Sequence, residues 1–476
     1  MTESWATSAF GTDLHLDLKG PGLRASLMDA LRDAVRTGRL VSGTRLPSSR
    51  SLAVDLGIAR NTVADAYAEL VAEGWLSAQQ GSGTRVATRA VPRPVAPTAV
   101  PAPPSGRRLA LSLVPGSPDL AEFPRREWLA ASRRALTAAP NDAFGCGDAL
   151  GRVELRTAVA DYLARARGVY ADPGHVVICS GFHHGLMLMA QVLVGRGVRA
   201  VAVEDYGLDG HRDLLAGAGL RTPPVAVDGR GTCTDDLADL PDVGAVLMTP
   251  SHQYPTGVAL HPERRAAAVG WARATGGLIL EDDYDGEFRY DRQPVGALQG
   301  LDPDRVVYFG TASKPLATGL RLGWMVLPAA LVAEIVAAKG HADWMSSSLE
   351  QLTLAEFIAS GAYERHVRSM RLRYRRRRDQ LVAELARRVP GIRVTGIAAG
   401  LHAVLELPAG TEASVVEAAA HNGLAVTGMA QFRGAARVSG AVAPAPDALV
   451  VGYATPSDSA WAGALDALCG VLPQAR

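Results

Sequence analysis

The sequence has few cysteines, almost no net charge and no long hydrophobic segment. Its four cysteines are scattered through 476 residues, at Cys146, Cys179, Cys233 and Cys469. This spacing argues against a disulfide framework or a zinc site and is typical of a reducing compartment. The first residues show no basic segment followed by an apolar one, and no uncharged apolar run reaches roughly 18 residues. We therefore expect a cytoplasmic protein with no membrane anchor and no metal site.

The net charge and the length of the chain limit which partners and how many domains can be expected. A formal net charge of +1 gives no indication of a nucleic-acid partner, so any DNA contact must come from local placement of basic side chains. A chain of 476 residues exceeds one ordinary core, which predicts two or more domains. A hydrophobic content of 48% with a mean hydropathy of +0.07 is typical of a well-packed globular protein. No internal repeats are present.

The N-terminal part has the order of elements of a winged helix-turn-helix. Residues 23–39 place apolar side chains at helical spacing, and two further helical segments meet at Gly57. Two short strands, over residues 75–76 and 84–86, are predicted around a glycine-rich tip. These residues resemble the GntR DNA-binding domain, and we assign that domain to residues 15–87. The alternative is a small helical domain that contacts another protein.

The second helix of this motif carries the side chains suited to base recognition. Its first residues would enter the major groove, where arginine suits guanine and asparagine suits adenine. Two arginines before it are placed to hold phosphates, and the small residues of the tip could approach the sugar-phosphate backbone. The candidate DNA-binding residues are Arg45, Arg50, Arg60, Asn61, Thr62, Gly83 and Thr84.

A proline-rich linker follows, over residues 88–107. Its six prolines exclude a helix or a central strand and predict a semi-extended spacer. Such a spacer lets two tethered domains move relative to one another; the alternative is an inert tether.

The rest of the chain alternates short apolar strands with amphipathic helices. Strands are predicted at residues 176–179, 200–203, 245–248, 278–280, 306–309 and 324–327. This alternation indicates a mainly parallel sheet wrapped by helices, with ligands at the strand ends. We expect a large α/β domain over residues 108–330 and a smaller C-terminal α/β domain over residues 331–476. A strongly basic helix over residues 368–381 is either a solvated face or a non-specific aid to DNA binding.

Polar residues follow several of these strands. Lys314 follows an apolar strand, and burial there would lower its pKa and free its amine to attack an aldehyde. Hydroxyl groups and an arginine nearby would suit a phosphate. The acidic residues after the 278–280 strand could keep a pyridine nitrogen protonated. A solvated surface lysine is the alternative for Lys314.

Four motifs in this order carry a resemblance to a known family. They are SGFHHG (180–185), TPSHQYPTG (249–257), EDDYDGEFRY (281–290) and TASKPLATGLRLG (311–323). The chain resembles a fold-type I aminotransferase domain, and most closely the version in MocR/GabR-type regulators of the GntR superfamily. The resemblance implies pyridoxal 5′-phosphate as cofactor, with Lys314 as the Schiff-base lysine. The implied cofactor-binding residues are Gly181, Phe182, His183, Tyr206, Gln253, Asp282, Tyr284, Thr311, Ser313 and Arg321.

Some of these assignments have alternatives. Asp283 and Asp285 compete with Asp282 for the pyridine nitrogen, and His252 competes with Gln253 on the same face of the pocket. Three positions also depart from the family pattern. Cys146 and Leu208 stand where relatives often have tyrosines, and Val450 stands where an arginine usually holds a substrate carboxylate. Arg433 or Arg437 could substitute for that arginine.

The resemblance implies a homodimeric transcription regulator. It would bind double-stranded DNA at an operator near its own or an adjacent gene. Its aminotransferase-like domain would sense either pyridoxal 5′-phosphate itself or an amino compound that reacts with it. The alternatives are a working aminotransferase with an accessory DNA-binding domain, and a DNA-binding scaffold with an empty pocket. Without the carboxylate-binding arginine, the case for catalytic turnover and for an α-amino acid effector is weaker.

Overall fold

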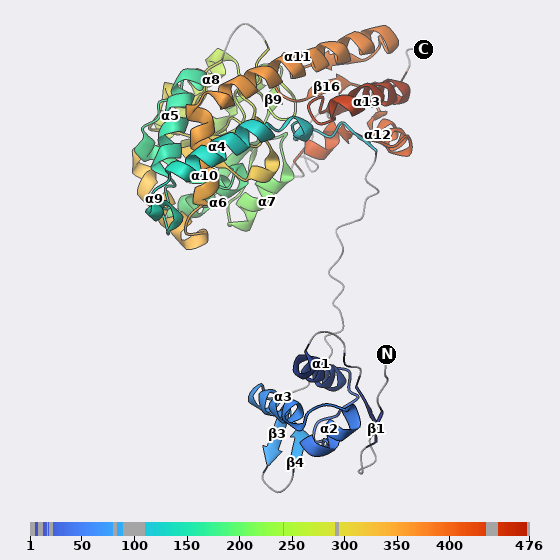
Figure 1. Ribbon diagram of the computed structural model, residues 1–476. Helices are drawn as coiled ribbons and strands as arrows, with labels where there is room; N and C mark the ends of the chain where they lie inside the picture. The colour runs from blue at the N-terminus through green and yellow to red at the C-terminus, as the bar shows by residue number, and fades with distance from the viewer. Residues whose placement is uncertain are drawn as a thin grey trace. The chain divides into compact units, whose positions relative to one another are not determined.

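A computed structural model gives the arrangement of the chain (Figure 1). It describes residues 5–7, 13–16, 18, 22–79, 83–88, 110–240, 242–290, 295–434 and 446–473. The chain divides into two compact units, Met1–Gly106 and Arg107–Arg476. Most of the proline-rich segment and Arg437 lie outside the described residues. Among the helices that are described, none is both long enough and apolar enough to cross a bilayer.

The first unit is a winged helix-turn-helix, as the sequence predicts. Its three helices are α1 (Leu23–Arg36), α2 (Ser49–Leu56) and α3 (Arg60–Ala72). The wing is an antiparallel hairpin of β3 (Leu76–Gln79) and β4 (Gly83–Val86). A further antiparallel pair is formed by β1 (Trp5–Thr7) and β2 (Asp13–His15).

Local signals in the sequence set the helix-turn-helix. The Ser48 hydroxyl accepts a hydrogen bond of 3.1 Å from the backbone N–H of Ser51 and so caps α2. Gly57 ends that helix in the left-handed conformation, with φ of 66°, which a side chain would disfavour. The hydroxyl of Tyr67 donates to the carbonyl of Pro47 and ties α3 to the segment before α2. Apolar residues from all three helices, Leu27, Leu52 and Leu70 among them, are fully buried in one core.

A seven-stranded sheet forms the centre of the second unit. Its order is β6-β14-β13-β12-β11-β7-β8, and only β14 runs antiparallel to its neighbours among the described strands. The strands are β6 (Val176–Cys179), β7 (Ala200–Glu204), β8 (Pro224–Val225), β11 (Val243–Met248), β12 (Leu278–Asp282), β13 (Val306–Thr311) and β14 (Gly323–Val326). The mainly parallel sheet predicted from the sequence is confirmed.

Helices cover both faces of this sheet because successive strand residues face opposite ways. In β13, Val307 and Phe309 pack with α6 and α9, whereas Tyr308 packs with α5 and α10. Burial on both faces explains why the strands are nearly continuous apolar runs. The helices concerned are α4 (Arg125–Ala138), α5 (Val153–Arg167), α6 (Phe182–Gly195), α7 (Asp209–Gly217), α8 (Pro262–Thr275), α9 (Ala329–Ala342) and α10 (Ser348–Ala359).

A smaller antiparallel sheet, in the order β15-β16-β19-β18, forms the second layer of this unit. Its strands are β15 (Arg393–Thr395), β16 (Ala403–Glu406), β18 (Thr427–Gly428) and β19 (Ala448–Val451). It shares a core with α11 (Ala362–Arg388), α12 (Glu412–His421) and α13 (Asp458–Val471). The short strand β5 (Leu111–Ser112) pairs in parallel with β17 (Leu424–Ala425).

The packing differs in two places from the expected division at residue 330. Leu331, Ile335 and Leu354 join the cores around the seven-stranded sheet, so α9 and α10 pack with the larger layer. Residues 111–113, which precede the large layer in sequence, instead pair with the smaller one. Sequence order alone could not show either arrangement, because both depend on contacts between distant segments.

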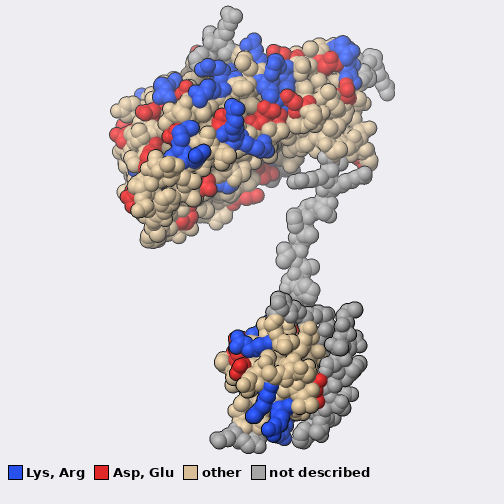
Figure 2. All heavy atoms as spheres, viewed as in Figure 1, with Lys and Arg blue, Asp and Glu red and all other residues tan. Residues whose placement is uncertain are grey.

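The arginines of the basic helix α11 lie in two different environments. Arg377 is 3% exposed and pairs with Asp119 and Asp458, so part of the basic run is structural and not a solvated face. Arg375 and Arg376 are exposed. Figure 2 shows basic side chains gathered along the edge of the larger unit where α11 lies in Figure 1.

Gly310 gives a stability test of the sheet. A Cβ atom there would lie 2.1 Å from Nε1 of Trp324, a fully buried side chain in the neighbouring strand. We expect Gly310→Ala to destabilise the second unit by about 2–3 kcal/mol, because a buried indole has no room to shift. Gly195→Ala, at the end of α6 with open space around it, is the control and should be neutral or slightly stabilising. Urea midpoints of the two variants would measure the difference; equal midpoints would contradict it.

Candidate functional site

A cavity of about 650 Å³ lies at the carboxyl ends of the parallel strands β7, β11, β12 and β13. Most of the residues that the sequence singled out for a cofactor line it. These are Phe182, His183, Tyr206, Asp282, Tyr284, Thr311, Ser313, Lys314 and Arg321. Gly181 and Gln253 do not line the cavity; Gly181 caps α6 beside it, and the buried amide of Gln253 donates to Glu204 behind its wall.

Lys314 projects into this cavity from the loop after β13. Its Nζ donates to the carbonyl oxygen of Gly116, which belongs to a segment 198 residues earlier in the chain. Burial lowers the pKa of Lys314, and the nearby carboxylates of Asp282 and Asp285 oppose that shift. A lowered pKa leaves more of the amine uncharged at neutral pH than in a solvated lysine, which suits a nucleophile.

The three acids after β12 have three different environments. Asp283 is held by Arg167, with Nε and Oδ2 2.7 Å apart, and also accepts from Tyr308. Asp285 contacts Nδ1 of His252 at 2.8 Å. Asp282 lines the cavity and accepts no hydrogen bond from any described residue. Of the three, Asp282 is therefore the carboxylate available to a ligand.

The electrostatics of Asp282 suit a cationic ligand group. Burial raises the pKa of its carboxyl well above the ordinary value, and Lys314 opposes the shift. A buried carboxylate of this kind gains most from a partner that carries a proton and a positive charge. A protonated pyridine nitrogen is such a partner.

An anion-binding cradle lies at the other end of the cavity. Arg321 has a left-handed backbone conformation with φ of 52°, and its guanidinium lies against Gly181, where a Cβ atom would be 3.4 Å from the nearest nitrogen. Gly181 is the N-cap of α6 and provides no side-chain cap, so the first N–H groups of the helix are open to an anion. Thr311 donates to Ser313 at 2.9 Å, which places two hydroxyl groups beside the same helix end.

The residues present therefore fit pyridoxal 5′-phosphate. Arg321, the hydroxyls of Thr311 and Ser313 and the N-terminus of α6 could hold its phosphate. Asp282 could hold the ring nitrogen, and Lys314 could react with the aldehyde. No described carboxylate pairs with Arg321, which leaves its guanidinium available to a phosphate.

Tyr284 stands beside a buried His–Asp pair. Its hydroxyl lies 3.1 Å from Nδ1 of His252, the atom that also contacts Asp285. The ring of His402 lies at a tilt to that of His252, with 4.9 Å between the centroids, and its Nε2 donates to the carbonyl of Pro255. Side-chain atoms of His252, Asp285 and His402 lie within 4.8 Å of one another, as in a metal site. Hydrogen bonds from His252 to Asp285 and from His402 to the carbonyl of Pro255 engage ring nitrogens of both histidines.

Other groups in the cavity had no clear signal in the sequence. Glu204 is buried and accepts hydrogen bonds from Thr232, Thr249 and Gln253. His211 packs against Phe182, and burial lowers its pKa to about 4. Burial likewise lowers the pKa of His402 to about 3. Isolated histidines and a segment just after a linker carry no recognisable motif, so sequence reasoning missed both histidines and the cavity wall formed by residues 112–117.

The structure also shows where the positions that depart from the family pattern lie. Val450 is fully buried among apolar residues of the smaller sheet. Leu208 and Tyr206 both line the cavity, while exposed Cys146 does not. Arg433 pairs through its backbone with Tyr206 and does not line the cavity.

In the first unit, the candidate DNA-binding residues lie at the start of α3, on α2 and the segment before it, and on the wing. Arg60, Asn61 and Thr62 form the first turn of α3, and the first two are exposed. Arg50 is exposed on α2. Arg45 is exposed, and its side chain lies beside Gly83 of the wing, with Nε 3.1 Å from where a Cβ atom of Gly83 would be. Thr84 follows in β4.

Two family models match the chain. Residues 23–86 match "Bacterial regulatory proteins, gntR family", and residues 116–447 match "Aminotransferase class I and II". The pyridoxine biosynthesis transcriptional regulator PdxR of Corynebacterium glutamicum is 33% identical over 424 residues, 86% of this chain and 88% of that protein. The probable rhizopine catabolism regulatory protein MocR of Rhizobium meliloti is 34% identical over 382 residues, 76% of each chain.

Solved structures show the same fold for the second unit. An archaeal alanine:glyoxylate aminotransferase has a TM-score of 0.69 at 24% identity, covering 76% of this chain and 90% of that one. An aspartate aminotransferase mutant from Thermus thermophilus has a TM-score of 0.66 at 21% identity, covering 76% of this chain and 96% of that one. These likenesses show the fold alone.

Proposed function

The chain belongs to the MocR-type transcriptional regulators, with a GntR DNA-binding domain and an aminotransferase class I and II domain, and we propose that it senses pyridoxal 5′-phosphate. One observation carries the proposal. Asp282 comes from the EDDYDGEFRY motif, Lys314 and Arg321 come from the TASKPLATGLRLG motif, and all three line one cavity. The GntR domain indicates DNA binding, and the aminotransferase fold implies dependence on this cofactor in the family.

Each residue would have a distinct part in holding the cofactor. Arg321, Ser313, Thr311 and the first N–H groups of α6 would bind the phosphate, and Lys314 would form the covalent link. Asp282 would keep the ring nitrogen protonated and Tyr284 would face the ring hydroxyl. When bound, the cofactor supplies an aldehyde for amines and a ring that accepts electrons. Phe182, His183 and Tyr206 would contact the ring, while Gly181 and Gln253 would support the wall.

The charges in the cavity favour the cofactor itself as the effector. Arg321 is the cavity-lining guanidinium left available to an anion. The other arginine lining the cavity, Arg212, donates to the carbonyls of Glu204 and Asp205 and pairs with Asp209. Low pKa values keep His211 and His402 uncharged at neutral pH. Among the residues that the structure describes, this leaves one anion site, which suits one phosphate and leaves none for an α-carboxylate. The name of the Corynebacterium relative, a pyridoxine biosynthesis regulator, supports the same effector.

DNA would be read by the first turn of α3, with Arg60 and Asn61 at base edges and Arg45 and Arg50 at phosphates. A homodimer would present two such helices to two half-sites. Exposed apolar side chains on the second unit support self-association. Leu129, Phe144 and Trp344 are 70%, 55% and 65% exposed.

The test is a DNA titration with and without the cofactor. A labelled duplex from upstream of the protein's own gene is titrated at fixed salt, because phosphate contacts make affinity salt-dependent. We expect the cofactor to change the Kd by roughly fivefold or more, the lower end of ordinary coupling between sites. A random duplex of equal length is the control. Equal affinity for both duplexes, or steady oxo-acid production from an amino donor, would contradict a regulator that senses the cofactor.

A further inference from the structure

The segment that joins the linker to the cavity is fixed at both ends to the smaller layer. We call residues 111–119 the strap. At its start, Leu113 donates to the carbonyl of Ala425, and Gly452 donates back to Leu113. Gly452 must be a glycine, because a Cβ atom there would lie 2.8 Å from the strap at Pro115. The Thr455 hydroxyl reaches the strap too, donating to the carbonyl of Val114.

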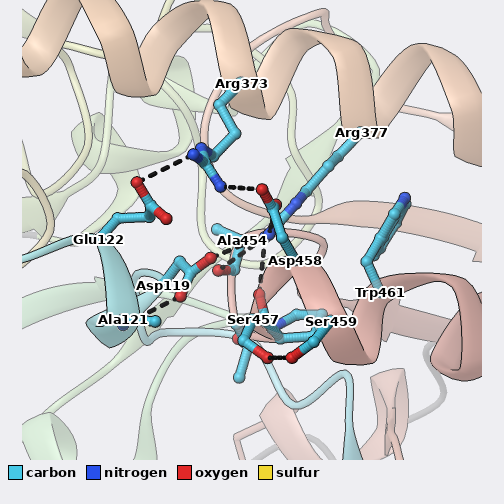
Figure 3. A network of polar contacts seen from close by, with 12 residues as sticks. Asp119, Ala121, Glu122, Arg373, Arg377, Ala454, Ser457, Asp458, Ser459 and Trp461 are labelled. Carbon is cyan, nitrogen blue, oxygen red and sulfur yellow. Dashed lines mark hydrogen bonds and ion pairs between the residues drawn. The ribbon is translucent and has the colours of Figure 1, made fainter.

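The other end of the strap is anchored by a charged network in which the Arg377–Asp119 pair is buried (Figure 3). Arg377 of α11 lies 2.9 Å from Oδ2 of Asp119 and 2.5 Å from Oδ1 of Asp458. Arg373, on the same helix, pairs with Glu122 at 2.9 Å and with Asp458. The backbone N–H of Asp119 donates to the hydroxyl of Tyr374. Buried charged pairs of this kind hold a segment in one position, because breaking one leaves a charge without a partner.

The middle of the strap is part of the cofactor cavity. Residues 112 and 114–117 all line it. Its carbonyl at Gly116 accepts the hydrogen bond from Nζ of Lys314, which extends from the end of β13 in the larger sheet. This contact joins the strap to the residue proposed to bind the cofactor. Gly116 has φ of 105°, so the turn that presents this carbonyl depends on glycine.

We propose that the Lys314–Gly116 hydrogen bond is the sensor contact: it holds the strap when Lys314 is a free amine and releases the strap when Lys314 binds the cofactor covalently. This inference rests on the proposed function. The strap continues directly into the proline-rich segment that leads to the DNA-binding unit. The anchors at Leu113 and Asp119 remain, so it is the middle of the strap, residues 114–117, that is freed. The loosened strap then holds the segment that leads to the DNA-binding unit less firmly, which changes the affinity for DNA. The ligand then acts through unequal affinity for two states of the strap.

The chemistry of the covalent link breaks this contact. The nitrogen of Lys314 attacks the aldehyde carbon, a C=N bond forms, and the C=O bond breaks. Both hydrogens of the neutral amine leave with the aldehyde oxygen as water. The nitrogen of the neutral product carries no hydrogen and cannot donate to the carbonyl of Gly116. No oxidant or further reactant is required.

Two substitutions of Lys314 distinguish release of the strap from other ways of sensing the cofactor. Lys314→Met keeps the apolar stem but has no donor, so the strap should be released without cofactor. Its DNA Kd without cofactor should lie within about twofold of that of the cofactor-loaded wild type. Lys314→Arg keeps a donor for Gly116 but forms no stable link. Its Kd for DNA should therefore not change when pyridoxal 5′-phosphate is added.

The result that overturns the inference is a Lys314→Met protein that binds DNA like the cofactor-free wild type, while the wild type still responds to the cofactor. A wild type that shows no response at all would instead contradict the proposed function, so the two failures are distinct. Hydrogen–deuterium exchange on the wild type needs no variant. Peptides covering the strap should exchange at least about twofold faster with saturating pyridoxal 5′-phosphate; unchanged or slower exchange contradicts release.

Discussion

Lys314→Ala is expected to abolish covalent attachment of pyridoxal 5′-phosphate, with complete loss of the visible absorbance band of the bound cofactor. The physical reason is the placement of this amine. Burial lowers the pKa of Lys314, so the uncharged nucleophile is present at neutral pH to a greater extent than in a solvated lysine. Its Nζ already lies in the cavity that Asp282 and Arg321 line.

The composition of the chain makes this prediction easy to check. The sequence contains three lysines, Lys19, Lys314 and Lys339. Lys339 is fully buried and pairs with Asp343 at 2.7 Å, so it offers no accessible amine. Borohydride reduction of the loaded protein followed by peptide mass analysis should place the adduct on Lys314 in the wild type. An unchanged band in Lys314→Ala, or an adduct on another amine, would show that the lysine is wrongly assigned.

The sequence was informative wherever function depends on strand ends. Parallel strands bring their carboxyl ends to one edge of a sheet, so motifs after β12 and β13 could be expected to meet. Asp282, Lys314 and Arg321 do line one cavity. The helix-turn-helix was equally visible because its signals are local: a serine cap, Gly57 and periodic apolar residues.

What the sequence could not supply depends on distant partners. The sequence does not distinguish the three neighbouring acids. In the structure, Arg167 pairs with Asp283 and His252 contacts Asp285. Gln253 was expected in the site, but its amide is used by Glu204 and backbone carbonyls behind the wall. The contact between Lys314 and Gly116 spans 198 residues, and neither residue type predicts the other. Likewise, the basic run on α11 gave no sign that Arg377 is a buried anchor.

Arg321→Met is expected to weaken the binding of pyridoxal 5′-phosphate by about 10- to 150-fold. The reason is that hydrogen bonds to charged groups contribute about 1.5–3 kcal/mol each. Methionine meets the same backbone constraint as arginine at φ of 52°, so the change removes the guanidinium without relieving the turn. Pyridoxal, which lacks the phosphate, should bind the variant within about twofold of the wild type. The measured quantity is therefore the ratio of the two Kd values, followed by the absorbance of the bound cofactor.

Arg212→Met is the matched control for that ratio. Arg212 lines the same cavity, but its guanidinium is already used by the carbonyls of Glu204 and Asp205 and by Asp209. Its loss should weaken the binding of pyridoxal and of pyridoxal 5′-phosphate to the same extent and leave the ratio of their Kd values unchanged. If Arg212→Met lowered the preference for the phosphate and Arg321→Met did not, the phosphate would lie at the opposite side of the cavity from the N-terminus of α6. Asp282 and Lys314 would then face the wrong ends of the ring, and the proposed orientation of the cofactor would have to be reversed.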